Sequence, residues 1–317
     1  MNPFVINDEQ QASFLEDGYL LLEDAVPKKL LHHWQALAER LEREAMKAHH
    51  EREQLHGACV VEDPVGPRLM RYDDILAIDP KACLDLLACP AMMAIARCLS
   101  GRGTVPLQLD ILYKQQHPHP VIKWHQGAPH PRSYPYLNIG IYLDDAPSGD
   151  GCLRYVPGTQ HGLLDIDALS REHGWEIPGV VEQPAAEGDI LVQDMMILHG
   201  SQPKRSPGVR RTIYVELRPY EGVIESAEQS ERWAELRKQW MQLVLQRCKS
   251  GDWPDDWVSE YGYLDTTEEA IIRALIEERE PPTPAVWGIQ SVEREDYPVP
   301  EDMKDWPKSE QDAAPKP

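Results

Sequence analysis

The sequence predicts a mainly β domain, a barrel or a sandwich, with helices before and after it. Three observations support this fold class. Between residues 104 and 217, short apolar segments alternate in polarity as strands do, and Gly, Pro or Asp separates them. No long helical pattern interrupts that region, which disfavours alternating β and α units. Helical spacing of apolar residues is found mainly in the residues before 100 and after 220.

The first hundred residues are predicted to be mostly helical. Asp8 can cap a short helix that stops at Gly18, and the apolar run 19–22 follows as a strand. A longer helix is expected over 28–49, where apolar residues recur near helical spacing. A second helical region, 76–100, is expected to be broken at Pro80 and Pro90.

The remaining elements follow the same reasoning. Strands are predicted over 105–114, 136–143, 151–158, 188–194 and 211–217. An insertion between strands contains 170–175, and helices are predicted over 227–248 and 266–280. We therefore predict two parts: residues 1–220 as the β domain with its N-terminal helices, and residues 221–317 as an acidic helical extension and tail packed on it.

Composition excludes several classes of function. The chain has 317 residues and a net charge of −21, which argues against nucleic-acid binding because phosphates require Lys and Arg. It has no run of 18 apolar residues, no secretory signal pattern and no C-x-x-C pair among its six cysteines. We expect a soluble cytoplasmic protein that acts on a small molecule and has no nucleic-acid or membrane partner.

Two histidines are the first candidates for chemistry. His125 and His199 each stand at the end of a strand-like run, and Arg210 opens the next one. Two imidazoles on facing strands suit iron, copper or zinc.

These residues belong to a longer pattern that resembles the phytanoyl-CoA dioxygenase family of iron(II)/2-oxoglutarate oxygenases. The matching segments are W-H-Q at 124–126, L-D-D at 143–145, D-G-C-L to P-G-T-Q-H at 150–161, H-G-S at 199–201 and R-R at 210–211. The resemblance covers residues 8–220, about two thirds of the chain. It implies a double-stranded β-helix, that is, a cupin-like jelly roll, with helices packed outside.

The resemblance also implies residue roles. His125 and His199 would bind iron(II), and Arg210 would hold the distal carboxylate of 2-oxoglutarate, with O2 as the other cosubstrate. A planar guanidinium suits this task because it binds a carboxylate through two hydrogen bonds. Arg211, next along the strand, should point to the opposite face and have a structural role.

Gly127 is the departure from the family pattern. The family's third ligand is an Asp or Glu two residues after the first histidine, because alternation puts 125 and 127 on one face of a strand. Glycine offers no ligand.

Three interpretations follow from Gly127. The first and favoured one is a halogenase: related enzymes with Gly or Ala at this position bind chloride at iron and transfer halogen rather than hydroxyl. The second is a hydroxylase in which water or another carboxylate completes the site. The third is a silent binding protein, although retention of His125, His199 and Arg210 weighs against simple decay. Carboxylates within sequence range are Asp194, Asp144 and Asp145.

A few further residues are weaker candidates. Loop histidines could line the substrate pocket or lie exposed: His117, His119 and His130. One strand face that could shape the pocket carries Asn138, Gly140 and Tyr142. Trp124 is expected in the core. A local basic pocket could include Lys123, Arg132 and Arg154.

Overall fold

A computed structural model gives the structure of the chain. It describes residues 4–53, 55–63, 65–118, 122–127, 134–249, 251–278 and 280. Across these residues no single helix is long and apolar enough to span a membrane, although a bent pair, 80–87 with 90–100, would pass by length and composition alone.

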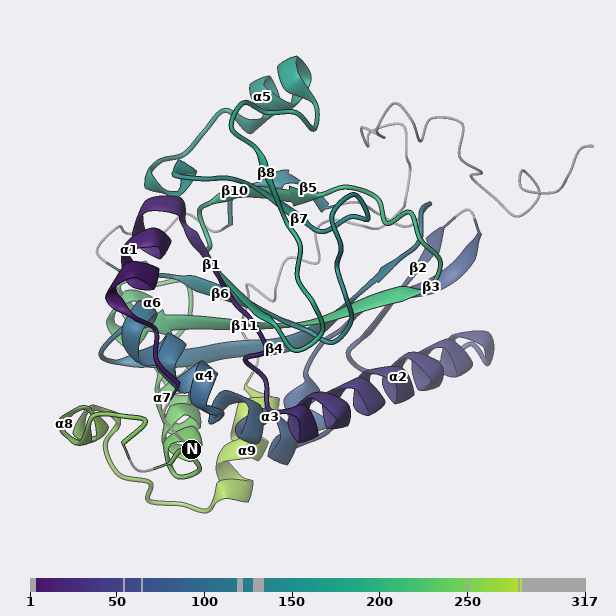
Figure 1. The fold of residues 1–317 in the computed structure, drawn as a ribbon. Coiled ribbons are helices and arrows are strands. Elements are labelled where there is room, and N and C mark those ends of the chain that lie inside the picture. The colour runs from purple at the N-terminus through teal and green to yellow at the C-terminus, as the bar shows by residue number, and fades with distance from the viewer. Residues whose placement is uncertain are drawn as a thin grey trace, which may run out of the picture.

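Two antiparallel sheets face each other and form a double-stranded β-helix, a jelly roll, as predicted (Figure 1). The large sheet has the order β1 (Tyr19–Leu22), β9 (Ile190–Asp194), β6 (Leu137–Tyr142), β11 (Val209–Pro219), β4 (Thr104–Gln115), β3 (Gly66–Tyr72), β2 (Ala58–Asp63). The small sheet has the order β5 (Ile122–His125), β10 (Leu198–Ser201), β7 (Leu153–Val156), β8 (Val181–Gln183).

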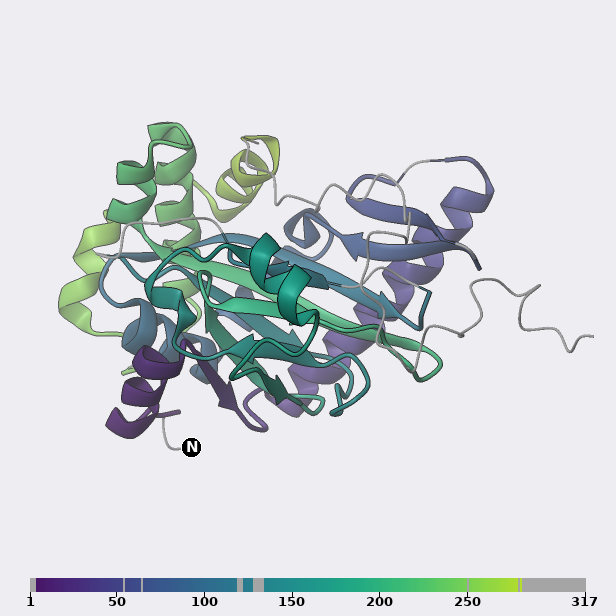
Figure 2. The ribbon, with the colours of Figure 1, turned by 90° about the horizontal axis from the view of Figure 1, so that it is seen from above.

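Helices cover the outer side of the large sheet (Figure 1). They are α2 (Lys28–His50), α3 (Pro80–Leu87), α4 (Pro90–Ile95), α7 (Glu231–Leu245) and α9 (Glu268–Glu277). The view from above shows α5 (Ile166–His173) over the small sheet (Figure 2). The remaining helical elements are α1 (Asp8–Asp17), α6 (Tyr220–Ser226), α8 (Asp255–Val258) and the short turns Ile75–Ala77, Ala96–Ser100, Thr159–His161 and Ser259–Tyr261.

The large sheet has an apolar face and a polar face, because neighbouring strand residues point in opposite directions. On the outer face, Ile213 and Val215 of β11 are fully buried and belong to one core with Trp34 of α2 and Trp240 of α7. Burial of this face against helices is the main source of stability of the fold.

The inner face, toward the small sheet, carries many polar side chains. Lys114, Asp110, Gln193 and Arg210 are all nearly fully buried there. Buried polar groups are costly unless they are hydrogen-bonded or paired, so a strand face of this composition indicates a binding site rather than a packing surface.

Several sequence predictions need correction. Asn7, not Asp8, caps α1: its side chain accepts from the Gln10 amide, and the Gln10 side chain accepts from the Asn7 amide. The region 76–100 is interrupted at Pro80 and Pro90 as predicted, and each proline begins a new helix, α3 or α4, because a first-turn proline lacks only an N–H that has no helical partner.

The C-terminal part also differs in detail from the prediction. The helix expected from 227 begins at Glu231, and a separate helix, α6, precedes it. Trp233 and Trp240 of α7 share the core of the large sheet, so the described part of the extension packs on the β domain. The tail 281–317 lies outside the described residues, and the boundary at 220 stays a prediction.

Candidate functional site

The two predicted histidines lie directly opposite each other. β5 and β10 are antiparallel neighbours, His125 pairs with His199, and their ring centroids are 4.0 Å apart. His125 ends its strand as predicted, whereas His199 is the second residue of β10 and not the end of a run. The register between β5 and β10 therefore brings the two histidines together.

Both imidazoles are prepared to act as ligands. Nδ1 of His125 donates to the Lys123 carbonyl and Nδ1 of His199 to the Ile197 carbonyl, each at 2.8 Å. These bonds place the proton of each neutral ring on Nδ1 and its lone pair on Nε2. Burial lowers the pKa of His125, and burial together with the nearby His125 lowers the pKa of His199 well below its ordinary value. Metal binding requires the neutral ring that these shifts favour.

Gly127 is not on the strand with His125, contrary to the prediction from alternation. β5 ends at His125, and the Gly127 N–H donates to the Met195 carbonyl at 2.5 Å. A Cβ built on Gly127 would lie 2.4 Å from that carbonyl oxygen. Glycine is needed here for close backbone approach, and no side chain fits at this position without a main-chain shift.

The carboxylates considered as substitutes for the third ligand have other partners. Asp144 accepts three hydrogen bonds from Arg211, Asp145 accepts from the Glu187 amide, and Asp194 accepts from the Met196 amide. In the part of the chain that the structure describes, no Asp, Glu or Cys joins the two histidines to form a three-residue metal site. Arg211 has the structural role that was predicted.

Gln193 is a residue that sequence reasoning missed. It lies on the inner face of β9, 2% exposed, with its Nε2 at 2.9 Å from Nε2 of His199. Its Oε1 accepts from the Tyr155 hydroxyl at 2.5 Å. Because Nδ1 of His199 already donates, Nε2 of His199 is the acceptor in this contact. The only sequence signal was an amide in the otherwise apolar strand 190–193.

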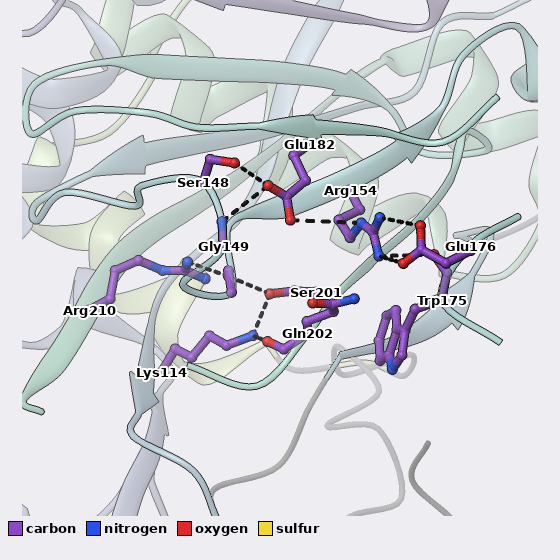
Figure 3. Close-up of polar contacts among 11 residues, drawn as sticks. Lys114, Ser148, Gly149, Arg154, Trp175, Glu176, Glu182, Ser201, Gln202 and Arg210 are labelled. Carbon is purple, nitrogen blue, oxygen red and sulfur yellow. Dashed lines mark hydrogen bonds and ion pairs between the residues drawn. The ribbon is translucent and has the colours of Figure 1, made fainter. Parts of the chain in front are cut away.

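Arg210 and a second cation, Lys114, form a buried pair on neighbouring strands. They stand directly opposite each other on β11 and β4 (Figure 3). Arg210 donates to the Gly151 carbonyl at 2.5 Å, and Lys114 donates to the Ser201 hydroxyl and the Gln202 carbonyl. Burial, and the charge of Arg210, lower the pKa of Lys114 well below its ordinary value.

This cation pair fits a carboxylate. Among the described residues, Nε of Arg210 and the hydroxyl of Tyr142 are buried without a hydrogen-bond partner, and Arg210 opposes the rise that burial causes in the pKa of Tyr142. Among the described residues, neither Lys114 nor Arg210 has a carboxylate partner in an ion pair. Buried cations of this kind are normally paired, so the chemistry of the site matches the distal carboxylate of 2-oxoglutarate.

Other predicted residues lie elsewhere. Arg154 of β7 pairs with Glu176 on the outer side of the small sheet, so it does not line the pocket (Figure 3). Trp124 is buried in a small cluster as predicted, and Lys123 is exposed. His117 donates its backbone N–H to the Lys204 carbonyl. Three residues named in the sequence analysis lie outside the described residues: His119, His130 and Arg132.

Comparison with known protein families identifies the family of the chain. A model of the phytanoyl-CoA dioxygenase (PhyH) family matches residues 14–212, more than half of the chain. The chain belongs to this family. It is therefore a member of the iron(II)/2-oxoglutarate oxygenase superfamily, and its histidine pair and Arg210 fall inside the matched region.

Solved structures share the fold. EctD from S. alaskensis with bound Fe has a TM-score of 0.56 at 22% identity, covering 68% of this chain and 78% of its own. HygX from Streptomyces hygroscopicus, with nickel and 2-oxoglutarate bound, has a TM-score of 0.55 at 18% identity, covering 68% and 88%. AviO1 from Streptomyces viridochromogenes Tue57 has a TM-score of 0.55 at 27% identity, covering 68% and 96%.

A shorter match connects the chain to a hydroxylase. L-proline trans-4-hydroxylase from Streptomyces griseoviridis is 31% identical over 110 residues, which cover 30% of this chain and 39% of that enzyme. The chain thus spans about two fifths of the length of this curated relative.

Proposed function

We propose that the protein oxidises an aliphatic C–H bond of a small polar molecule, with iron(II), 2-oxoglutarate and O2. The observation that carries this proposal is the histidine pair, whose strand β10 also gives Ser201 as a hydrogen-bond partner to Lys114, one of two buried basic side chains without a carboxylate partner among the described residues. When bound, the iron would couple reduction of O2 to decarboxylation of 2-oxoglutarate and to oxidation of the substrate.

Each residue has a role in this proposal. His125 and His199 would hold the iron through Nε2, with their ring orientation fixed by the carbonyls of Lys123 and Ile197. Arg210 and Lys114 would hold the distal carboxylate of 2-oxoglutarate. Their burial excludes water, which strengthens both charged contacts.

Hydroxylation is the outcome that we propose first. The Met195 carbonyl lies along the Cβ direction of Gly127, so this glycine is explained by close backbone approach and does not by itself require a halide. The hydroxylase relative agrees with this choice. Halogenation at a chloride-bound iron, predicted from the glycine, is the second candidate. It is favoured by the lack of a carboxylate ligand among the described residues, because a site with neutral ligands attracts an anion.

The inner face of the large sheet supports a polar substrate. It carries two buried ion pairs, Arg71 with Asp110 at 2.5 Å and Arg218 with Glu216 at 3.0 Å. Burial raises the pKa of Asp110 to about 7, even though Arg71 opposes the rise. A sheet face with this many charged side chains suits a small molecule with charged groups, such as the L-proline in the name of the relative, better than a long acyl chain.

The test is anaerobic addition of iron(II) and 2-oxoglutarate, followed by visible absorption with and without chloride. A charge-transfer band that is lost in His199→Ala and is indifferent to chloride is the result expected for a hydroxylase. A band that needs or shifts with chloride would favour halogenation. The lack of a band under all conditions would overturn both. Cytoplasmic location stays a prediction.

A further inference from the structure

We propose that the side-chain amide of Gln193 is the third protein ligand of the metal, in the role that a carboxylate at position 127 cannot fill. This inference rests on the proposed function, because it concerns the same iron site. It assigns a ligand from the large sheet to a centre whose two histidines come from the small sheet.

The distance between Gln193 and His199 supports this assignment. Nε2 of Gln193 lies 2.9 Å from Nε2 of His199. Two ligands at right angles around an octahedral ion, each bonded at about 2.1 Å, are about 3.0 Å apart. An atom of the Gln193 amide already stands at the separation of neighbouring ligands from His199.

The amide can present its oxygen to the ion by a half turn. At present its NH2 group faces His199 and its oxygen faces the Tyr155 hydroxyl. An ion on the Nε2 lone pair of His199 removes the acceptor of that NH2 group and repels it. Rotation about the last side-chain bond directs the oxygen to the ion and the NH2 group to the oxygen of Tyr155, which can accept a hydrogen bond.

The surroundings hold Gln193 in place for this role. Its backbone is fixed between two strands, opposite Tyr19 of β1 and Asn138 of β6. Tyr155 is itself stacked on Tyr19, with ring centroids 4.6 Å apart, so the hydroxyl that orients the amide is rigid. A preorganised side chain loses little conformational entropy when it binds the ion.

The proposal also explains how the site can lack a carboxylate. Gly127 is blocked by Met195, and no acidic side chain among the described residues reaches the histidine pair. Three neutral protein ligands would leave the full charge of the ion to be balanced by the anionic 2-oxoglutarate. Amide oxygens are hard donors that suit divalent iron better than they suit copper(I) or zinc in a thiolate site.

The experiment measures metal affinity rather than turnover. Cobalt(II), as a stand-in for iron(II), is titrated anaerobically into the full chain and followed by its visible absorption. We expect Gln193→Leu to weaken binding about 10-fold or more. Gln193→Glu should tighten it, because a carboxylate replaces an amide. Gln242→Leu is the matched control: it makes the same substitution at a buried glutamine of α7, on the outer side of the large sheet, and should leave affinity unchanged.

A second comparison asks which position, 127 or 193, can supply a carboxylate ligand to the metal. Gly127→Asp should fail to tighten cobalt binding, because its Cβ meets the Met195 carbonyl. Cobalt binding by Gln193→Leu that equals or exceeds that of the wild type would overturn the proposal, since Gln193 would then be a blocker or a bystander. If Gln193→Leu does not fold, unchanged affinity in Gln193→Glu would overturn it equally. If the wild-type protein binds no cobalt(II) at all, that result would instead overturn the proposed function.

Discussion

At the scale of single residues, the need for glycine at position 127 comes from a neighbouring backbone carbonyl. Its Cβ position is 2.4 Å from a backbone oxygen, which cannot rotate away as a side chain would. We expect Gly127→Ala to lower the free energy of unfolding by about 1–3 kcal/mol, the usual cost of overpacking. Urea denaturation measures this. Gly162→Ala is the control, because a Cβ there meets nothing within 4 Å; an equal loss in both variants would contradict the explanation.

Lys114 is the second residue whose role depends on a neighbour. Replacing this buried amine with an apolar side chain, in Lys114→Met, removes one of the two partners that we propose for the distal carboxylate of 2-oxoglutarate. We expect the dissociation constant for 2-oxoglutarate to rise about 30-fold or more, the equivalent of about 2 kcal/mol. Isothermal titration calorimetry measures it, with the exposed Lys81→Met as the control. An unchanged constant would remove Lys114 from the binding site.

The lowered pKa of Lys114 predicts a pH dependence. Burial favours the neutral amine in the free protein, whereas a bound carboxylate favours the ammonium, so binding raises the pKa of Lys114. Between those two pKa values, binding takes up a proton, and affinity for 2-oxoglutarate falls as pH rises through that interval. Calorimetry in buffers of different ionisation enthalpy counts the protons. Proton release, or affinity that rises with pH, would be the contrary result.

At the scale of elements, the two faces of β11 carry residues with different roles, one face toward the site and the other toward structural contacts. Arg210 points inward to the site, whereas Arg211 points outward and is held by Asp144 through its backbone N–H and its guanidinium. That bidentate contact connects β11 to the segment after β6.

Asp144→Ala should therefore affect stability but not ligand binding. We expect a loss of about 1–3 kcal/mol in the free energy of unfolding, because Arg211 loses its acceptor, while the dissociation constant for 2-oxoglutarate stays unchanged. Asp145→Ala, which removes an acceptor of one backbone N–H, should cost less. A marked change in 2-oxoglutarate affinity in Asp144→Ala would show that the two faces of β11 are coupled.

At the scale of the whole molecule, the C-terminal helices and the jelly roll share one core. Trp240 of α7 is 3% exposed and belongs to the same cluster as the outer face of the large sheet. Trp240→Ala should lower the free energy of unfolding by about 3–5 kcal/mol. Tryptophan fluorescence and far-UV circular dichroism should then report one coincident transition; two separate transitions would mean that α7 unfolds on its own.

Most strands, the two histidines and Arg210 could be predicted because their signals are local or lie in a family pattern. Lys114 and Gln193 could not, because their importance comes from the strands they face, and pairing across the sheets is not encoded in local spacing. The conformation of Gly127 depends on Met195, far along the chain. The register between strands that are distant in the sequence is what could not be predicted from local sequence patterns.

The two-sided character of β11 has a consequence for how this protein can change over time. Even-numbered positions 210–216 face the site, and odd-numbered positions 211–217 face the helices or their flanking contacts. Substitutions at even positions can alter specificity while the scaffold persists. A single-residue deletion in this strand would exchange the two sets, burying guanidinium among aliphatic side chains and opening isoleucine to the site. New specificities on this scaffold can therefore evolve by amino-acid substitution in β11 but not by insertion or deletion within the strand.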